Sequence, residues 1–209
     1  MRASIDLSLY LVTDSGLTRG RDLRDVVREA VEGGVTIVQL REKEMATGDF
    51  VALARDLKII LDPYGVPLII NDRVDVALAA DADGVHIGQL DMAYEDVRRL
   101  LGEDKIVGLS TENLVEVEEA NSLDVDYIGI SPVYDTQTKT DTSPAFGLEG
   151  CRRAVELTRH ATVAIGGMNM STVGAVVATG VDGVAVVSAI VSADDPRAAS
   201  QELLAAVRA

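Results

Sequence analysis

Three cationic side chains follow short apolar runs in a chain that is otherwise strongly acidic. Arg41 and Lys43 follow one such run, and Lys139 lies after another. The chain contains 34 Asp and Glu residues against 19 Lys and Arg residues, which gives a formal net charge of -15. Basic loops on an acidic protein indicate a small polyanionic ligand. We therefore expect these three cations to bind such a ligand.

Two carboxylates, Asp72 and Asp91, occupy similar positions after two further apolar runs. Two carboxylates are too few to enclose a cation, but they suit Mg²⁺ whose other ligands are water and substrate phosphate. Each Asp could instead cap the helix that follows it, because Asp is a favoured N-cap residue. Phosphorylated substrates would account for the cations and the carboxylates together, so Mg²⁺ is the expected cofactor.

A second anion site is predicted near the end of the chain. Gly166 and Gly167 would let backbone N–H groups approach a phosphate, and Val187 and Ser188 would add donors and a hydroxyl group. A plain turn at the glycines and a helix cap at Ser188 remain open. By contrast, His86 lies within an apolar run, and we expect it to be a core residue rather than a catalyst.

The chemistry-bearing residues all follow predicted strands, which alternate with helical patterns. Nearly continuous apolar runs, typical of parallel strands covered on both faces, predict strands over Leu9–Val12, Ile37–Leu40, Leu68–Ile70, Gly84–Ile87, Ile106–Leu109, Tyr127–Ile130, Val163–Ile165 and Gly183–Val187. Apolar residues at helical spacing predict helices that end at Gly33 and at Asp62. Asp195 and Pro196 are typical of the start of a final helix.

Eight strand–helix units in 209 residues predict a (β/α)₈ TIM barrel in the α/β class, formed by residues 1–209 as a single domain. A doubly wound open sheet is the competing architecture, but the expected glycine-rich turn after the first strand is missing. In a barrel the loops after the strands form the active face. The longest irregular segment, Pro132–Gly147, is expected to close over that face.

Composition excludes several classes of protein. A strongly acidic chain with 3% aromatic residues is a poor binder of nucleic acid or anionic membranes. The apolar stretch around Asp182 is interrupted by that charge, so we expect no membrane span and a cytoplasmic protein. One cysteine, Cys151, excludes a disulfide framework. The acidic composition is either an adaptation to high salt or simple bias, and a homo-oligomer stays open.

Five motifs in order resemble those of the thiamine-phosphate synthase family. They are Gln39-Leu40-Arg41-Glu42-Lys43, Asn71-Asp72-Arg73, Gly88-Gln89-Leu90-Asp91, Thr136-Gln137-Thr138-Lys139 and Ala164-Ile165-Gly166-Gly167. The resemblance extends from Tyr10 to the last helix. It implies a TIM-barrel transferase that joins 4-amino-2-methyl-5-(diphosphooxymethyl)pyrimidine to 4-methyl-5-(2-phosphooxyethyl)thiazole, with thiamine phosphate and diphosphate as products.

The resemblance also implies roles for individual residues. Asp72 and Asp91 would hold Mg²⁺, and the catalytic residues would be Arg41, Lys43, Ser110 and Lys139. The motif residues and their neighbours would bind these small-molecule substrates, namely Gln39, Leu40, Arg41, Glu42, Lys43, Asn71, Ser110, Thr136, Gln137, Thr138, Lys139, Gly167, Val187 and Ser188.

The sequence departs from the family pattern at three positions. Glu112 replaces a His that often follows the Ser110 position, and Ser131 and Asp135 replace a Gly and a Pro. We expect Asp135 to face solvent, because a carboxylate beside a diphosphate would weaken its binding. Three alternatives remain: a thiazole tautomerase on the same fold, a phosphosugar isomerase, and a protein that binds thiamine phosphate without turnover.

Overall fold

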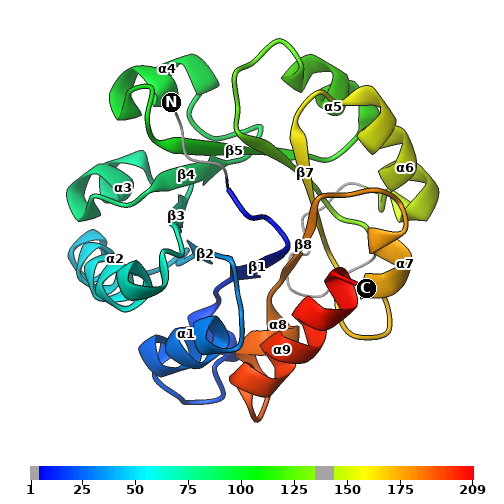
Figure 1. Cartoon of the computed structure of the whole chain (residues 1–209). Helices are drawn as coiled ribbons and strands as arrows, with labels where there is room; N and C mark the ends of the chain where they lie inside the picture. The colour runs from blue at the N-terminus through cyan, green and yellow to red at the C-terminus, as the bar shows by residue number, and fades with distance from the viewer. Residues whose placement is uncertain (1–4, 135–143) are drawn as a thin grey trace.

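Eight parallel strands form a closed barrel in the computed structural model, which describes residues 5–134 and 144–209 (Figure 1). Each strand pairs with the next in sequence, and the last pairs with the first. The strands are β1 (Leu9–Val12), β2 (Ile37–Leu40), β3 (Leu68–Asn71), β4 (Gly84–Ile87), β5 (Ile106–Thr111), β6 (Tyr127–Ile130), β7 (Ala161–Ile165) and β8 (Gly183–Val186). The predicted strands are therefore confirmed, with changed ends at β3, β5, β7 and β8.

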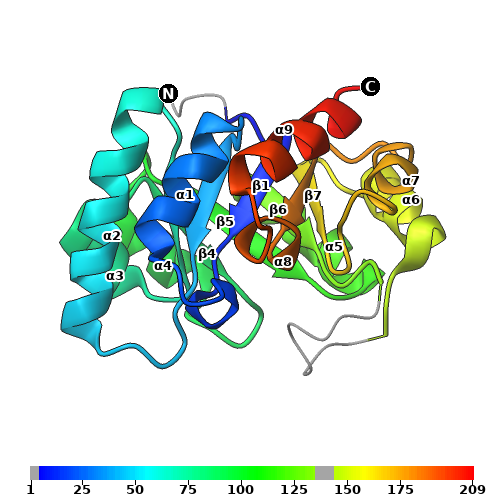
Figure 2. The same ribbon diagram turned by 90° about the horizontal axis from the view of Figure 1, so that it is seen from below.

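Helices follow the strands and surround the barrel on all sides (Figures 1 and 2). They are α1 (Leu23–Glu32), α2 (Thr47–Leu61), α3 (Val74–Ala80), α4 (Tyr94–Leu101), α5 (Leu114–Ala120), α6 (Gly147–Leu157), α7 (Val173–Val177), α8 (Ser188–Val191) and α9 (Pro196–Val207), with short 3₁₀ turns η1 (Ser15–Leu17) and η2 (Asp62–Tyr64). This arrangement confirms the predicted (β/α)₈ barrel and excludes the open doubly wound sheet.

Local sequence signals set the ends of several helices as predicted. The carboxylate of Asp195 accepts a hydrogen bond from the Ala198 N–H, and Pro196 is the first residue of α9. Gly33 ends α1, and Asp62 ends α2. These caps satisfy N–H and C=O groups that a helix end leaves without intrahelical partners.

The strands have two buried faces, which explains their nearly continuous apolar sequence. One cluster of buried side chains lies between the strands and the helices and includes Leu9, Leu11 and Leu40. A second cluster contains the residues that alternate with these, such as Tyr10 and Tyr127. Because side chains alternate along a strand, the second cluster fills the interior of the barrel.

A repeated hydrogen bond joins odd-numbered strands to the residue that precedes the next even-numbered strand. In each case a side-chain oxygen accepts a hydrogen bond from a backbone N–H near the start of the odd strand, and the accepting residues are Thr36, Asp83, Asp126 and Asp182. The Asp126 carboxylate accepts from the Val107 N–H at 2.8 Å. These bonds fix the register of strand pairs at the end of the barrel where the strands begin.

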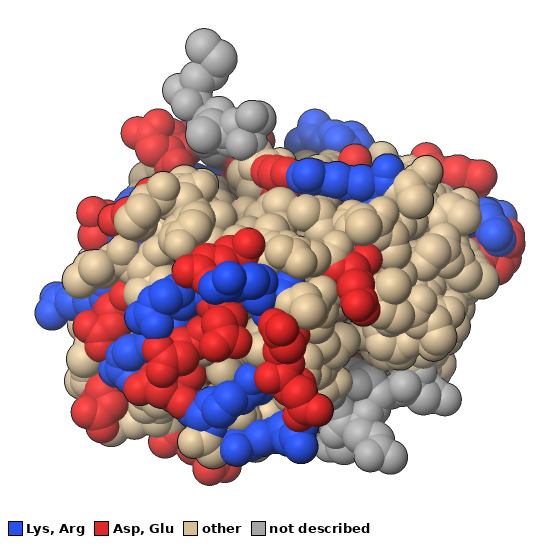
Figure 3. Space-filling view, turned by 60° about the horizontal axis from the view of Figure 1, so that its bottom comes forward, with Lys and Arg blue, Asp and Glu red and all other residues tan. Residues whose placement is uncertain are grey.

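Acidic and basic side chains lie next to one another on the face shown in Figure 3. Exposed ion pairs of this kind include Arg24 with Asp56 and Arg28 with Asp25. Such pairs reduce local repulsion between the many carboxylates. No helix among the described residues is long and apolar enough to cross a membrane.

Replacing Asp126 with Ala is expected to lower the free energy of unfolding by about 2 kcal/mol, because the Val107 N–H loses a charged acceptor. The Asp126 side chain is only 10% exposed and also pairs with Arg98, at 3.4 Å. Urea denaturation of the purified variant measures the change. Asp104→Ala is the matched control, since Asp104 is exposed and its loss changes the net charge equally. Equal stability of both variants would contradict the role given to Asp126.

Candidate active site

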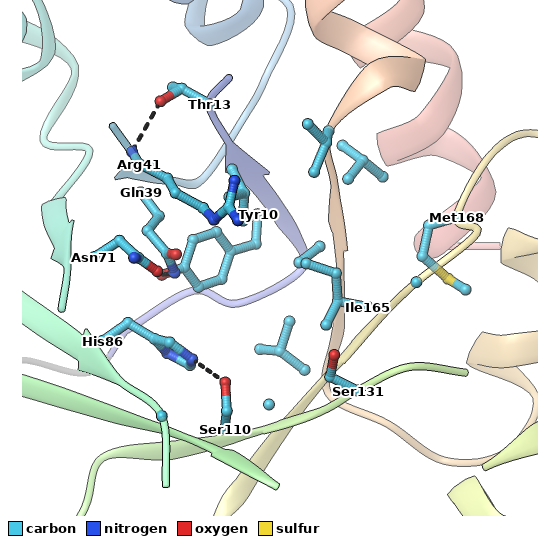
Figure 4. A pocket seen from close by; sticks show the side chains of 18 of the residues that line it. Tyr10, Thr13, Gln39, Arg41, Asn71, His86, Ser110, Ser131, Ile165 and Met168 are labelled. Carbon is cyan, nitrogen blue, oxygen red and sulfur yellow. Dashed lines mark hydrogen bonds between the residues drawn. The ribbon is translucent and has the colours of Figure 1, made fainter. Parts of the chain in front are cut away.

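A cavity of about 680 Å³ occupies the end of the barrel where the strands finish (Figure 4). Every strand contributes at least one lining residue, and the loops after the strands contribute the rest. Two inward positions carry small residues, Gly129 and Ala185, which leave room above the larger side chains deeper in the barrel. The cavity therefore lies where a TIM barrel places its active site.

Arg41 and Lys43, the two cations predicted after β2, both line the cavity. The backbone N–H of Arg41 donates to the buried Thr13 hydroxyl oxygen at 3.1 Å, which ties the end of β2 to that of β1 (Figure 4). Gln39 also lines the cavity from β2. The structure thus brings these three predicted substrate-binding residues together on one wall.

Leu40 and Glu42, which are also predicted to bind substrate, are not among the described residues that line the cavity. Leu40 is fully buried between the barrel and the helices, because alternation along β2 points it away from the interior. Glu42 accepts a hydrogen bond from the Ser15 hydroxyl, and burial raises the pKa of its carboxyl group.

Asp72 lies in a tight turn directly after β3. Its φ is 61°, a value that residues other than glycine rarely adopt. The Arg73 N–H donates to the Asn71 carbonyl oxygen at 2.7 Å across this turn, and the Asp72 N–H donates to the His86 carbonyl oxygen at 2.9 Å. Arg73, not Asp72, is the N-cap residue of α3, so Asp72 does not cap that helix. Unusual backbone held by its surroundings is typical of functional sites.

Asp91 faces Asp72 from the loop after β4. Burial raises the pKa of Asp72 to about 6, and the nearby Asp91 carboxylate adds to this rise, whereas Asn71 and Arg41 oppose it. One Asp91 oxygen accepts the Gly88 N–H at 2.7 Å, and Ala93 rather than Asp91 is the N-cap residue of α4. The two carboxylates are therefore held close together in spite of their mutual repulsion.

This pair of carboxylates fits a hard divalent cation. A cation between Asp72 and Asp91 would remove their repulsion, and carboxylate oxygens are ligands that Mg²⁺ prefers. Across residues 5–134 and 144–209, no group of three or more His, Cys, Asp or Glu residues is arranged to hold a metal ion. A metal held by two carboxylates would need water and a substrate oxygen to complete its shell.

A hydrogen-bonded group of side chains forms the polar floor of the cavity. The Gln39 amide donates to the Tyr10 hydroxyl oxygen at 2.8 Å, and the Tyr10 and Tyr127 hydroxyl groups lie 2.7 Å apart. The two nitrogens of His86 lie 3.0 Å from the Tyr127 hydroxyl and 2.8 Å from that of Ser110. These hydrogen bonds thus join side chains from β1, β2, β4, β5 and β6 into one group.

The opposite wall of the cavity comes from β7 and β8. Gly166, Gly167, Val187 and Ser188 all line it. A side chain at Gly166 would place its Cβ 2.8 Å from Pro132, and φ is 105° and 72° at the two glycines. Close packing of the loop after β6 and positive φ thus require glycine here, whether or not a phosphate binds. Ser188 begins α8, while Val187 is its N-cap residue.

Some of the remaining predicted site residues line the cavity, and others lie outside the described part of the chain. Asn71 and Ser110 line the cavity, beside Gln39 and His86 respectively (Figure 4). The predicted substrate-binding segment Thr136, Gln137, Thr138 and Lys139 lies outside the described residues, as does Asp135. The part of the Pro132–Gly147 loop that is described includes Tyr134, whose N–H donates to the Gly166 carbonyl oxygen at 3.2 Å.

Sequence reasoning missed three residues of the cavity floor, namely Tyr10, His86 and Tyr127. His86 was predicted to be a core residue without a chemical role, yet it contacts the Ser110 hydroxyl in the cavity. The signal that could have found all three is alternation along the strands, because they share the inward face with Gln39 and Ser110. Glu112, a departure from the family pattern, also lines the cavity, and its N–H donates to Glu116.

Comparison with known proteins identifies the family. Residues 9–190 match the family model described as thiamine monophosphate synthase. Two curated proteins named thiamine-phosphate synthase are similar over nearly the whole chain. The protein of Albidiferax ferrireducens is 52% identical over 197 residues, covering 94% of this chain and 90% of that protein. The protein of Vibrio campbellii is 53% identical over 200 residues, covering 96% and 98%.

A solved structure agrees with these relatives. Thiamine phosphate pyrophosphorylase from Pyrococcus furiosus superposes with a TM-score of 0.89 and is 39% identical, covering 97% of this chain and 96% of that one. The two curated relatives are named as synthases and the solved structure as a pyrophosphorylase, and none of the three favours the thiazole tautomerase alternative. Sequence and structure together show that this chain belongs to the thiamine monophosphate synthase family.

Proposed function

We propose that this protein is a transferase that condenses 4-amino-2-methyl-5-(diphosphooxymethyl)pyrimidine with 4-methyl-5-(2-phosphooxyethyl)thiazole, giving thiamine phosphate and diphosphate, and that residues 1–209 work as one domain. Family membership supports the reaction. The observation that carries the proposal is a cavity with a carboxylate and cation wall at β2 to β4 and a glycine-rich wall across the barrel at β7 and β8. These two walls suit two phosphorylated substrates.

The reaction is a substitution at the methylene carbon of the pyrimidine. The bond from this carbon to the diphosphate oxygen breaks, and the oxygen keeps the electron pair. The electron-rich aminopyrimidine stabilises the resulting cation, and the lone pair of the thiazole nitrogen then forms the new bond to carbon. This path needs no covalent enzyme nucleophile, so the residues act by binding, orientation and charge.

Arg41 and Lys43 are proposed to bind the diphosphate. Both line the cavity, and the hydrogen bond that the Arg41 N–H donates to the Thr13 hydroxyl oxygen fixes the backbone at Arg41. Negative charge grows on the diphosphate as it leaves, and preorganised cations stabilise that charge without reorganising. Lys139 is proposed as a third such cation on the basis of its sequence motif.

Asp72 and Asp91 are proposed as the protein ligands of Mg²⁺. When bound there, the ion would supply further positive charge next to the leaving diphosphate. The backbone turn at Asp72 and the Gly88 bond to Asp91 hold both carboxylates toward the same point. Their fixed positions would orient the diphosphate relative to Arg41.

The wall formed by β7 and β8 is proposed to hold the thiazole phosphate. Gly167 and Ser188 line this wall and could offer backbone N–H groups, with the Ser188 hydroxyl as an additional donor. Binding the phosphate tail there would direct the thiazole ring toward the centre of the cavity. Holding both substrates in one cavity replaces a bimolecular encounter with an oriented pair.

An assay with both substrates and Mg²⁺ tests the proposed reaction. Oxidation converts thiamine phosphate to a fluorescent product, and a second assay measures the diphosphate released. We expect one diphosphate per thiamine phosphate, and no product when either substrate is left out. Isomerisation of the thiazole substrate alone, without consumption of the pyrimidine, would instead identify a tautomerase.

Asp72→Asn is expected to raise the Mg²⁺ concentration needed for half-maximal activity by at least about tenfold, since even an indirect metal contact is worth that much. Titration of activity with Mg²⁺ at saturating substrates measures the shift. Asp75→Asn is the control, because Asp75 lies in the same region but pairs with Arg73 at 2.6 Å and is absent from the described lining of the cavity. An unchanged Mg²⁺ requirement in the Asp72 variant would remove Asp72 from the metal site.

Lys139→Ala is expected to lower kcat by about 100-fold, the scale of losing one preorganised group that stabilises charge in the transition state. Steady-state kinetics with both substrates measures this loss. Lys105→Ala serves as the control, because Lys105 pairs with Asp81 at the other end of the barrel. If kcat stays unchanged in the Lys139 variant, this lysine has no part in the chemistry.

A further inference from the structure

The buried hydroxyl groups beneath the cavity form a continuous chain that begins and ends at cavity-lining residues. It runs from the Gln39 amide through Tyr10, Tyr127 and His86 to the Ser110 hydroxyl, and all four links are between 2.7 and 3.0 Å. Tyr10 is 1% exposed and Tyr127 is fully buried. Water therefore has little access to the central links of the chain.

One assignment of donors and acceptors gives every proton along the chain an acceptor. The Gln39 nitrogen donates to the Tyr10 oxygen. Either tyrosine oxygen could be the donor in the next bond, and we assign that role to Tyr10, because its proton then has the Tyr127 oxygen as acceptor. With this assignment the Tyr127 proton has Nδ1 of His86, 3.0 Å away, as its acceptor. Burial raises the pKa of both phenols above the ordinary value, so each keeps its proton.

The same logic sets the tautomer of His86. In the neutral ring one nitrogen donates and the other accepts. Because Nδ1 accepts from Tyr127, Nε2 carries the proton and donates to the Ser110 oxygen. The Ser110 hydroxyl is then an acceptor toward His86, which leaves its own proton available to an acceptor in the cavity that Ser110 lines.

We infer that Tyr127 is a positioning residue that acts through His86 to make the Ser110 hydroxyl a hydrogen-bond donor to the substrate. The substrate atom that it serves is an acceptor, such as a nitrogen of an aromatic ring. This inference rests on the proposed function, which places an aminopyrimidine in the cavity. If the Gln39 side-chain oxygen instead accepted the Tyr10 proton, every hydrogen bond in the chain would reverse. The Ser110 hydroxyl would then donate to His86 and could only accept from the substrate.

The packing around Tyr127 holds its ring against that of His86. The His86 and Tyr127 rings stack with centroids 5.5 Å apart and an angle of 27° between their planes. A Cβ atom at Gly108 would lie 2.6 Å from Nδ1 of His86 and would also overlap the end of the Tyr127 ring. Only glycine at this position leaves room for the link between Tyr127 and His86.

Imidazole ¹⁵N NMR tests the tautomer directly and needs no activity. The chain has only two histidines, so His160→Gln assigns the signals of His86. At neutral pH the native protein should show a protonated Nε2 and an unprotonated Nδ1 at His86. Tyr127→Phe removes the donor to Nδ1, and Gln39→Glu offers Tyr10 only an acceptor, so both should shift His86 toward the Nδ1-protonated tautomer. A native His86 with a protonated Nδ1 would overturn the inference, even if the enzyme makes thiamine phosphate.

A double-mutant cycle tests the link to function. Tyr127→Phe should lower kcat/KM about three- to tenfold, the scale of one neutral hydrogen bond. The same change in a Ser110→Ala background should cost less than twofold, because the hydroxyl that Tyr127 orients is gone. If Tyr127→Phe lowers kcat/KM by the same factor in the native and Ser110→Ala backgrounds, Tyr127 does not act through Ser110 and its role is merely structural. Tyr94→Phe is the matched control, since its hydroxyl donates to the Asp124 carbonyl outside the cavity at 2.8 Å; kcat/KM should stay unchanged.

Discussion

The close approach of two carboxylates at the ends of β3 and β4 is the constraint on which the site depends. Asp72 is held next to Asp91 by a turn with positive φ, and this proximity and burial raise its pKa to about 6. A fold that gained nothing from this pair would relax the turn or separate the charges. The arrangement suits a site that binds a cation, as proposed above for Mg²⁺.

The rest of the molecule can be understood as the support for that arrangement. Parallel strands finish at the same end of the barrel, so residues far apart in sequence meet around one cavity. Hydrogen bonds such as that from Val107 to Asp126 fix strand register at the opposite end. A slip of one residue would turn Gln39 outward and Leu40 inward. The hydrogen bonds that fix strand register and the residues of the cavity thus lie at opposite ends of the barrel.

The sequence was sufficient to predict the barrel, because each strand is an apolar run and each run is followed by a helical pattern. It also predicted which loops carry Arg41, Lys43, Asp72 and Asp91, since the strand ends are visible in the sequence. It did not predict the turn at Asp72, because a positive φ at a residue other than glycine depends on tertiary hydrogen bonds. Leu40 was assigned to the ligand by its position in a motif, whereas alternation along β2 buries it on the other face.

The polar floor was the hardest part to predict, because its chemistry is a property of the chain of residues and not of any one of them. Tyr10 and Tyr127 each look like ordinary core aromatics, and His86 looks like a buried histidine. Only the closed barrel brings β1, β4 and β6 close enough for these side chains to join Gln39 to Ser110. Once these side chains are joined, the donor and acceptor roles of each one depend on those of its neighbours. A hydroxyl that donates its single proton to one neighbour can only accept from the other. A buried tyrosine can therefore determine what a serine several ångströms away offers to the substrate, without touching that substrate itself.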